Sequence, residues 1–98
     1  MSPEPSIRIL IAEDHAFVQE GTRRLLNLER DMEVVGEASD GATAVRLVAE
    51  CDPTIVLMDI SMPVMDGIEA TREIRRLHPH LPVPVSYTHL TLPTILRV

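Results

Sequence analysis

Apolar and polar positions along the chain follow two patterns. Short apolar runs, rich in Ile and Val, lie within residues 7–12, 32–38 and 55–58, and such runs are typical of strands buried on both faces of a sheet. Between and after them, residues predicted to face inward recur at helical spacing. They are Phe17, Val18, Gly21, Leu25 and Leu28, then Ala42, Val45, Val48 and Ala49, and then Ile68, Thr71, Ile74 and Leu77. The pattern predicts strands in these three runs and helices from Phe17 to near Arg30, from Asp40 to Asp52 and from Asp66 to His78.

Capping residues support the second and third helices. Ser39 or Asp40 is a candidate N-cap for the second, and Asp66 with Glu69 three residues later resembles a capping box at the start of the third. A proline follows each of these helices and ends it, because the residue before proline avoids the helical conformation.

The alternating order of strands and helices predicts an α/β fold. Right-handed crossovers give a doubly wound, flavodoxin-like parallel sheet with helices on both faces, here truncated after the third βα unit. In the sheet order 2-1-3 the first and third strands are neighbours at the switch point, where ligands bind in such sheets.

Acidic residues follow these two strands directly. Glu13 and Asp14 follow the first strand and Asp59 follows the third, so the fold is expected to bring the three together. A lone Asp in this place more often caps a turn, but three close carboxylates raise one another's pKa unless a cation or strong donors offset the repulsion. An oxygen-rich pocket without a His or Cys ligand set suits Mg²⁺.

Such a pocket predicts phosphoryl transfer. Asp59 is the candidate nucleophile, and Mg²⁺ would neutralise charge on the phosphoryl oxygens. Asp14 is expected to bind the metal directly and Glu13 directly or through water. The backbone carbonyl of Ser61, on the loop after Asp59, is a candidate third ligand, and His15 is interpreted as a helix-start residue near the pocket, not a ligand.

The motifs ILIAEDH, VVGEASDG and IVLMDISMPVMDGIEATREIR, in this order, resemble the receiver domain of two-component response regulators, in the subgroup that precedes a LuxR-type helix-turn-helix domain. The resemblance covers about residues 7–83. It implies Mg²⁺-dependent phosphorylation of Asp59 by a partner sensor histidine kinase and a signalling domain that is not an enzyme. It further implies possible homodimerisation on phosphorylation, and contact with DNA only through a helix-turn-helix domain that this chain lacks.

Composition restricts the alternatives. A chain of 98 residues forms one small domain, and its net charge of −6 argues against a nucleic-acid surface. Cys51, the single cysteine, excludes an intrachain disulfide. Residues 1–6 are expected to be disordered, and because no leader or membrane segment is evident, we expect no membrane contact and a cytoplasmic location.

The last residues depart from the family pattern. A strand ending in Thr or Ser and a later Lys are expected, but the chain has no lysine, and half of its prolines lie between Pro79 and Pro93. From about Val85 the sequence resembles a translated sequencing adapter. We therefore interpret 7–83 as a partial receiver domain and 84–98 as a non-native tail.

Two other functions stay open. A phosphatase or phosphotransferase with an aspartate nucleophile also places Asp after an apolar strand, but that class expects a second aspartate where this chain has Ser61. The second alternative is a receiver-like interaction module that works without phosphorylation. The complete acidic set of Glu13, Asp14 and Asp59 argues against it.

Overall fold

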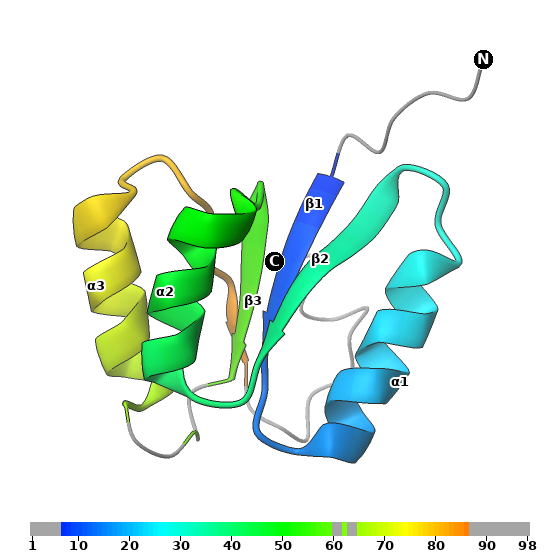
Figure 1. Ribbon diagram of the computed structural model, residues 1–98, viewed down its shortest axis with the longest axis horizontal. Coiled ribbons are helices and arrows are strands. Elements are labelled where there is room, and N and C mark those ends of the chain that lie inside the picture. The colour runs from blue at the N-terminus through cyan, green and yellow to red at the C-terminus, as the bar shows by residue number, and fades with distance from the viewer. Residues whose placement is uncertain (1–6, 60–61, 63–64, 87–98) are drawn as a thin grey trace.

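The computed structural model describes residues 7–59, 62 and 65–86, in which strands and helices alternate (Figure 1). The elements are β1 (Ile7–Ala12), α1 (Ala16–Asn27), β2 (Met32–Ala38), α2 (Gly41–Cys51), β3 (Ile55–Asp59), α3 (Gly67–Leu77) and β4 (Val85–Ser86). The expected disordered segment, residues 1–6, lies outside the described residues. Within the described ranges, no helix has the length and apolar character that crossing a membrane requires.

The sheet is parallel, with the strand order β2-β1-β3-β4. This order confirms the prediction that the first strand lies between the second and the third. Figure 1 shows α1 on one face of the sheet and α2 and α3 on the other. The pairing of β1 with β2 has one irregularity: Ile9 pairs with Val34 and Leu10 with Gly36, so Val35 is an extra residue in β2.

Two hydrophobic cores lie on opposite faces of the sheet, because successive side chains of a strand point to opposite sides. The core beneath α2 and α3 includes Leu10, Val56, Met58, Val48 and Ile74. The smaller core beneath α1 consists of Ile9, Ile11, Leu26 and Leu57. Strands β1 and β3 are thus buried on both faces, as their apolar composition predicts. Strand β2 lies at the edge of the sheet, and Ala38 is its buried residue.

The inward face of α1 differs from the stripe that the sequence indicates. Phe17 is 90% exposed and Leu28 is 78% exposed, whereas Leu26 is the residue of α1 that is buried. Helical spacing cannot distinguish these choices, because Leu25 and Leu26 are adjacent and either one completes an apolar stripe. The helix also ends at Asn27, three residues before the predicted end.

The helices α2 and α3 contact each other and bury small residues. In α2, Ala44 and Val48 are buried, whereas Ala42 and Ala49 of the predicted stripe are exposed. In α3 the buried residues are Gly67, Ala70, Thr71 and Ile74, and the flanking Ile68 and Leu77 are about half exposed. Small side chains allow the two helices to approach, so the larger apolar residues lie at the margins.

The segment after α3 pairs with β3 despite its prolines. The N–H of Val56 donates to the carbonyl of Pro82 (3.1 Å), and the N–H of Met58 donates to that of Pro84 (3.0 Å). Proline lacks an N–H but keeps its carbonyl, so this segment can accept bonds where Pro84 cannot donate. Val85 and Ser86 of the suspected tail form β4, and residues 87–98 lie outside the described residues.

Aspartate side chains cap α2 and α3. Asp40 Oδ1 accepts a hydrogen bond from the N–H of Thr43 (2.7 Å), and Asp66 Oδ1 accepts one from the N–H of Glu69 (2.8 Å). The structure therefore identifies Asp40, not Ser39, as the N-cap residue of α2. The hydrogen bond from the Thr43 backbone lowers the pKa of the Asp40 carboxyl, because it stabilises the charged form.

We expect Asp40→Ala to destabilise the chain more near neutral pH than in acid. A pKa lowered by folding contributes stability above the pKa of the unfolded chain, and this contribution is lost as the pH falls through the lowered folded value. Urea unfolding midpoints of both chains, measured near neutral pH and at about pH 3, test this. Ser39→Ala is the matched control and should change neither midpoint; equal effects of the two substitutions would contradict the assignment.

Candidate functional site

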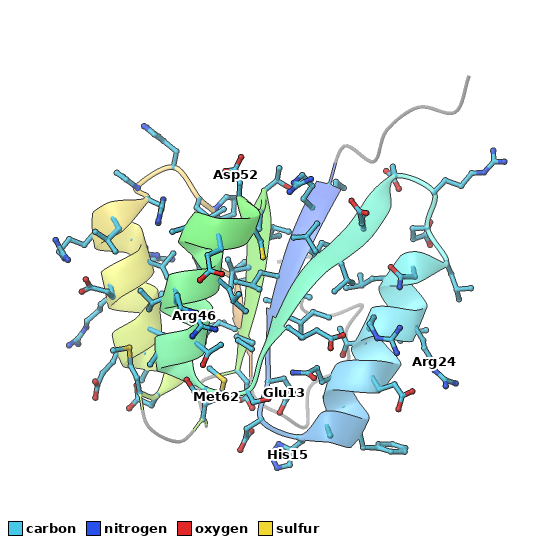
Figure 2. All side chains as sticks on the ribbon, viewed as in Figure 1. Glu13, His15, Arg24, Arg46, Asp52 and Met62 are labelled. Carbon is cyan, nitrogen blue, oxygen red and sulfur yellow. The ribbon has the colours of Figure 1, made fainter. Side chains whose placement is uncertain are left out.

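The carboxyl ends of β1 and β3 bring acidic residues together. Ala12 pairs with Met58, so Glu13 and Asp59, the next residues on these neighbouring strands, lie at the same edge of the sheet. One ligand atom from each of Glu13, Asp14, His15 and Asp59 can be chosen so that all four lie within 4.8 Å of one another. Figure 2 shows Glu13, His15 and Met62 at this end of the sheet and Asp52 at the opposite end.

Burial makes this cluster electrostatically costly. Glu13 is 6% exposed and Asp59 is 2% exposed. Burial raises the pKa of the Glu13 carboxyl, hydrogen bonds from His15 lower it in part, and the neighbouring Asp59 raises it again. Two buried carboxyl groups in contact disfavour a second negative charge unless a cation joins them.

His15 supplies a donor to the acidic cluster. It is the N-cap residue of α1, and its Nδ1 atom lies 2.8 Å from Glu13 Oε2 and 3.1 Å from Asp14 Oδ1. The hydrogen bond with Glu13 and the charge of Asp14 raise the pKa of the His15 imidazole. His15 is thus a helix-start residue, as interpreted from the sequence, but its ring also contacts two carboxylates, which the sequence did not reveal.

The donor set fits a hard divalent cation. Glu13, Asp14 and Asp59 supply carboxylate oxygens, the donors that Mg²⁺ prefers. Asp14 Oδ1 is buried and, in the described part of the chain, makes a charge contact with His15 but no hydrogen bond. Ser61, the predicted carbonyl ligand, lies outside the described residues. Met62, from the same loop, is 6% exposed and packs in the core beneath α2 and α3.

Two neighbours of the site were missed by sequence reasoning. The side chain of Gln19 donates to the carbonyl of Glu13 (3.0 Å) and to that of Ala38 (3.3 Å). A Cβ atom added to Gly41 would lie 2.0 Å from the carbonyl oxygen of Met65. The position of Gln19, one helical turn after His15, was a usable signal; nothing in the sequence indicates the contact at Gly41.

Comparison with known proteins identifies relatives of the whole described fold. A family model for the response regulator receiver domain matches residues 9–98. The transcriptional regulatory protein DegU of Brevibacillus brevis is 42% identical over 86 residues, which are 88% of this chain and 36% of that protein. LiaR of Bacillus subtilis is 50% identical over 70 residues, which are 71% of this chain and 33% of that protein.

A solved structure shows the same fold. The two-component response regulator of the LuxR family from Aurantimonas superposes with a TM-score of 0.81 at 38% identity, covering 94% of this chain and 66% of that one. Similar proteins also include a protein-glutamate methylesterase of Pyrococcus abyssi, 39% identical over 79 residues, which are 81% of this chain and 21% of that protein. The chain spans about a third of the length of DegU and LiaR.

Proposed function

The chain belongs to the response regulator receiver domain family, and on that premise we propose that Asp59 accepts a phosphoryl group from a sensor histidine kinase in a Mg²⁺-dependent step. The observation that supports this most is the meeting of three carboxylates from two neighbouring strands, with Asp59 2% exposed at the end of β3. Receiver domains of transcriptional regulators are signalling domains, and we propose the same role here, without catalysis on a free substrate.

Each acidic residue has a separate role in the proposal. A carboxylate oxygen of Asp59 attacks phosphorus, an oxygen–phosphorus bond forms, and the nitrogen–phosphorus bond to the donor histidine breaks, with the electron pair and a proton passing to that imidazole. Asp14 and Asp59 would hold Mg²⁺ directly, Glu13 directly or through water, and the carbonyl of Ser61 would complete the set. When bound, Mg²⁺ would neutralise charge on the phosphoryl oxygens.

We further propose that the intact protein is a transcription regulator that dimerises on phosphorylation and binds DNA through a helix-turn-helix domain outside this chain. The similarity to DegU, LiaR and a LuxR-family regulator supports this reading. An aspartate-nucleophile phosphatase has less support, because Ser61 stands where that class expects a second aspartate. The complete acidic set argues against an interaction module that works without phosphorylation.

We expect the 98-residue chain to gain one phosphoryl group from a small acyl phosphate when Mg²⁺ is present, and none when the metal is chelated. Intact mass spectrometry measures the gain. An aspartyl phosphate is an acyl phosphate, so hydroxylamine should remove the group, whereas a phosphoserine or phosphothreonine would survive. Labelling that does not depend on Mg²⁺, or that resists hydroxylamine, would overturn the proposed chemistry.

A further inference from the structure

The turn between β1 and α1 carries Glu13, Asp14 and His15, and its backbone is bonded to β2. The N–H of Glu13 donates to the carbonyl of Ala38 at the end of β2 (2.9 Å). The His15 ring contacts the carboxylates of the two residues that precede it, so it connects side chains within the turn.

The side chain of Gln19 adds a further link between this turn, α1 and the end of β2. Its half-buried side chain leaves α1 and places Nε2 3.0 Å from the carbonyl oxygen of Glu13 and 3.3 Å from that of Ala38. The backbone N–H of Gln19 donates to the carbonyl of His15 (2.9 Å) and closes the first turn of α1. One residue therefore joins α1 to the end of β2 and to the turn that follows β1 at the acidic edge.

The side-chain amide of Gln19 has the two hydrogen-bond donors that these two carbonyls require. One NH₂ group has two hydrogens and can donate to both carbonyls at once. Glutamate at this position could not donate when ionised and would add negative charge beside the cluster, and a shorter amide would not span the distance from the helix. The Glu13 carbonyl belongs to the peptide group between Glu13 and Asp14. Its direction therefore sets the backbone orientation of both residues, and with it the direction of both carboxylates.

We propose that Gln19 is a positioning residue that holds Glu13 and Asp14 in the arrangement that binds Mg²⁺. The proposal rests on the metal site of the proposed function, but it concerns a residue that itself contacts neither metal nor phosphoryl group. Outer partners of metal ligands commonly set affinity by fixing ligand geometry. Here the fixed group is the backbone carbonyl of Glu13, not its carboxylate.

Gln19→Met tests the proposal, because methionine has a similar length and no donor. We expect the Mg²⁺ dissociation constant, measured by calorimetric titration of the 98-residue chain with the metal alone, to rise on the order of tenfold. Asn27→Met is the matched control: it removes an exposed amide at the other end of α1 and should leave the constant within about twofold. A lower unfolding temperature of the Gln19→Met chain with an unchanged dissociation constant would overturn the proposal.

A second measurement needs no variant. In the unsubstituted chain, the side-chain NH₂ resonances of Gln19 should shift during a Mg²⁺ titration with the same midpoint as the backbone amides of Glu13 and Asp14, whereas those of Asn27 should not. Stationary Gln19 resonances at metal saturation would overturn the positioning role. If the unsubstituted chain binds no Mg²⁺ at all, the proposed metal site itself fails, so the two failures are distinguishable.

Discussion

The Asp59→Asn chain is expected to take up no phosphoryl label above background from a small acyl phosphate with Mg²⁺. Asparagine has nearly the same shape as aspartate, but its neutral amide is a far weaker nucleophile than a carboxylate and cannot form a stable acyl phosphate. Folding should persist, because the substitution removes one of two buried like charges in contact with each other. Radiolabel retained on the protein after gel filtration measures the uptake.

Asp66→Asn is the control for this experiment. Asp66 caps α3 through the N–H of Glu69, and asparagine is an equally good N-cap residue, so labelling should match that of the unsubstituted chain. The nucleophile would be wrongly assigned if the Asp59→Asn chain labelled as well as the original. Loss of label in both variants would point to a general effect on the fold.

We expect Gly41→Ala to destabilise the fold by about 2–3 kcal/mol or more, because the new methyl group has no space. The added Cβ would lie 2.0 Å from the carbonyl oxygen of Met65 and 2.8 Å from its carbonyl carbon. These are backbone atoms, so a side-chain rotation cannot relieve the overlap, and the start of α2 must separate from the loop that follows Asp59. Thermal and urea unfolding midpoints measure the loss.

Gly21→Ala is the matched control, since nothing lies within 4 Å of a Cβ added there. Alanine favours the helix over glycine, so this exposed position in α1 should gain about 0.5–1 kcal/mol. Opposite signs for the same chemical change would show that the effect at Gly41 comes from the contact with Met65. A Gly41→Ala chain as stable as the original would refute the steric argument.

The strands were the most predictable part of the fold. The bounds of β1 and β2 match the predicted runs, and β3 adds only Asp59. For β1 and β3 the reason is that a strand buried on both faces leaves a continuous apolar signal in the sequence. Helix starts were readable where an aspartate caps them, at Asp40 and Asp66. Inward helix faces were not, because adjacent apolar residues such as Leu25 and Leu26 give equally good stripes.

The acidic residues were predictable as a group because they lie at or just after the ends of two strands that the fold places at the switch point. What surrounds them depends on tertiary contacts that carry no local pattern. The reach of Gln19 to two carbonyls, the contact of the His15 ring with Glu13, and the tight approach of Met65 to Gly41 all arise between separate elements. Local sequence reports the chemistry of a residue but not its neighbours across the fold.

The extra residue in β2 has an evolutionary consequence. Because Val35 is skipped in the pairing, Ala12 lies opposite Ala38, and the Ala38 carbonyl is in place to accept from Glu13 and Gln19. If Val35 instead paired with Leu10, the uniform register would bring Glu37 opposite Ala12. A descendant that lost only Val35 would therefore keep Ala38 opposite Ala12, because the pairs from Leu10 and Gly36 onward would not change. A one-residue gap at this point of β2 is expected to leave the acidic edge intact, whereas a gap after Gly36 would shift it.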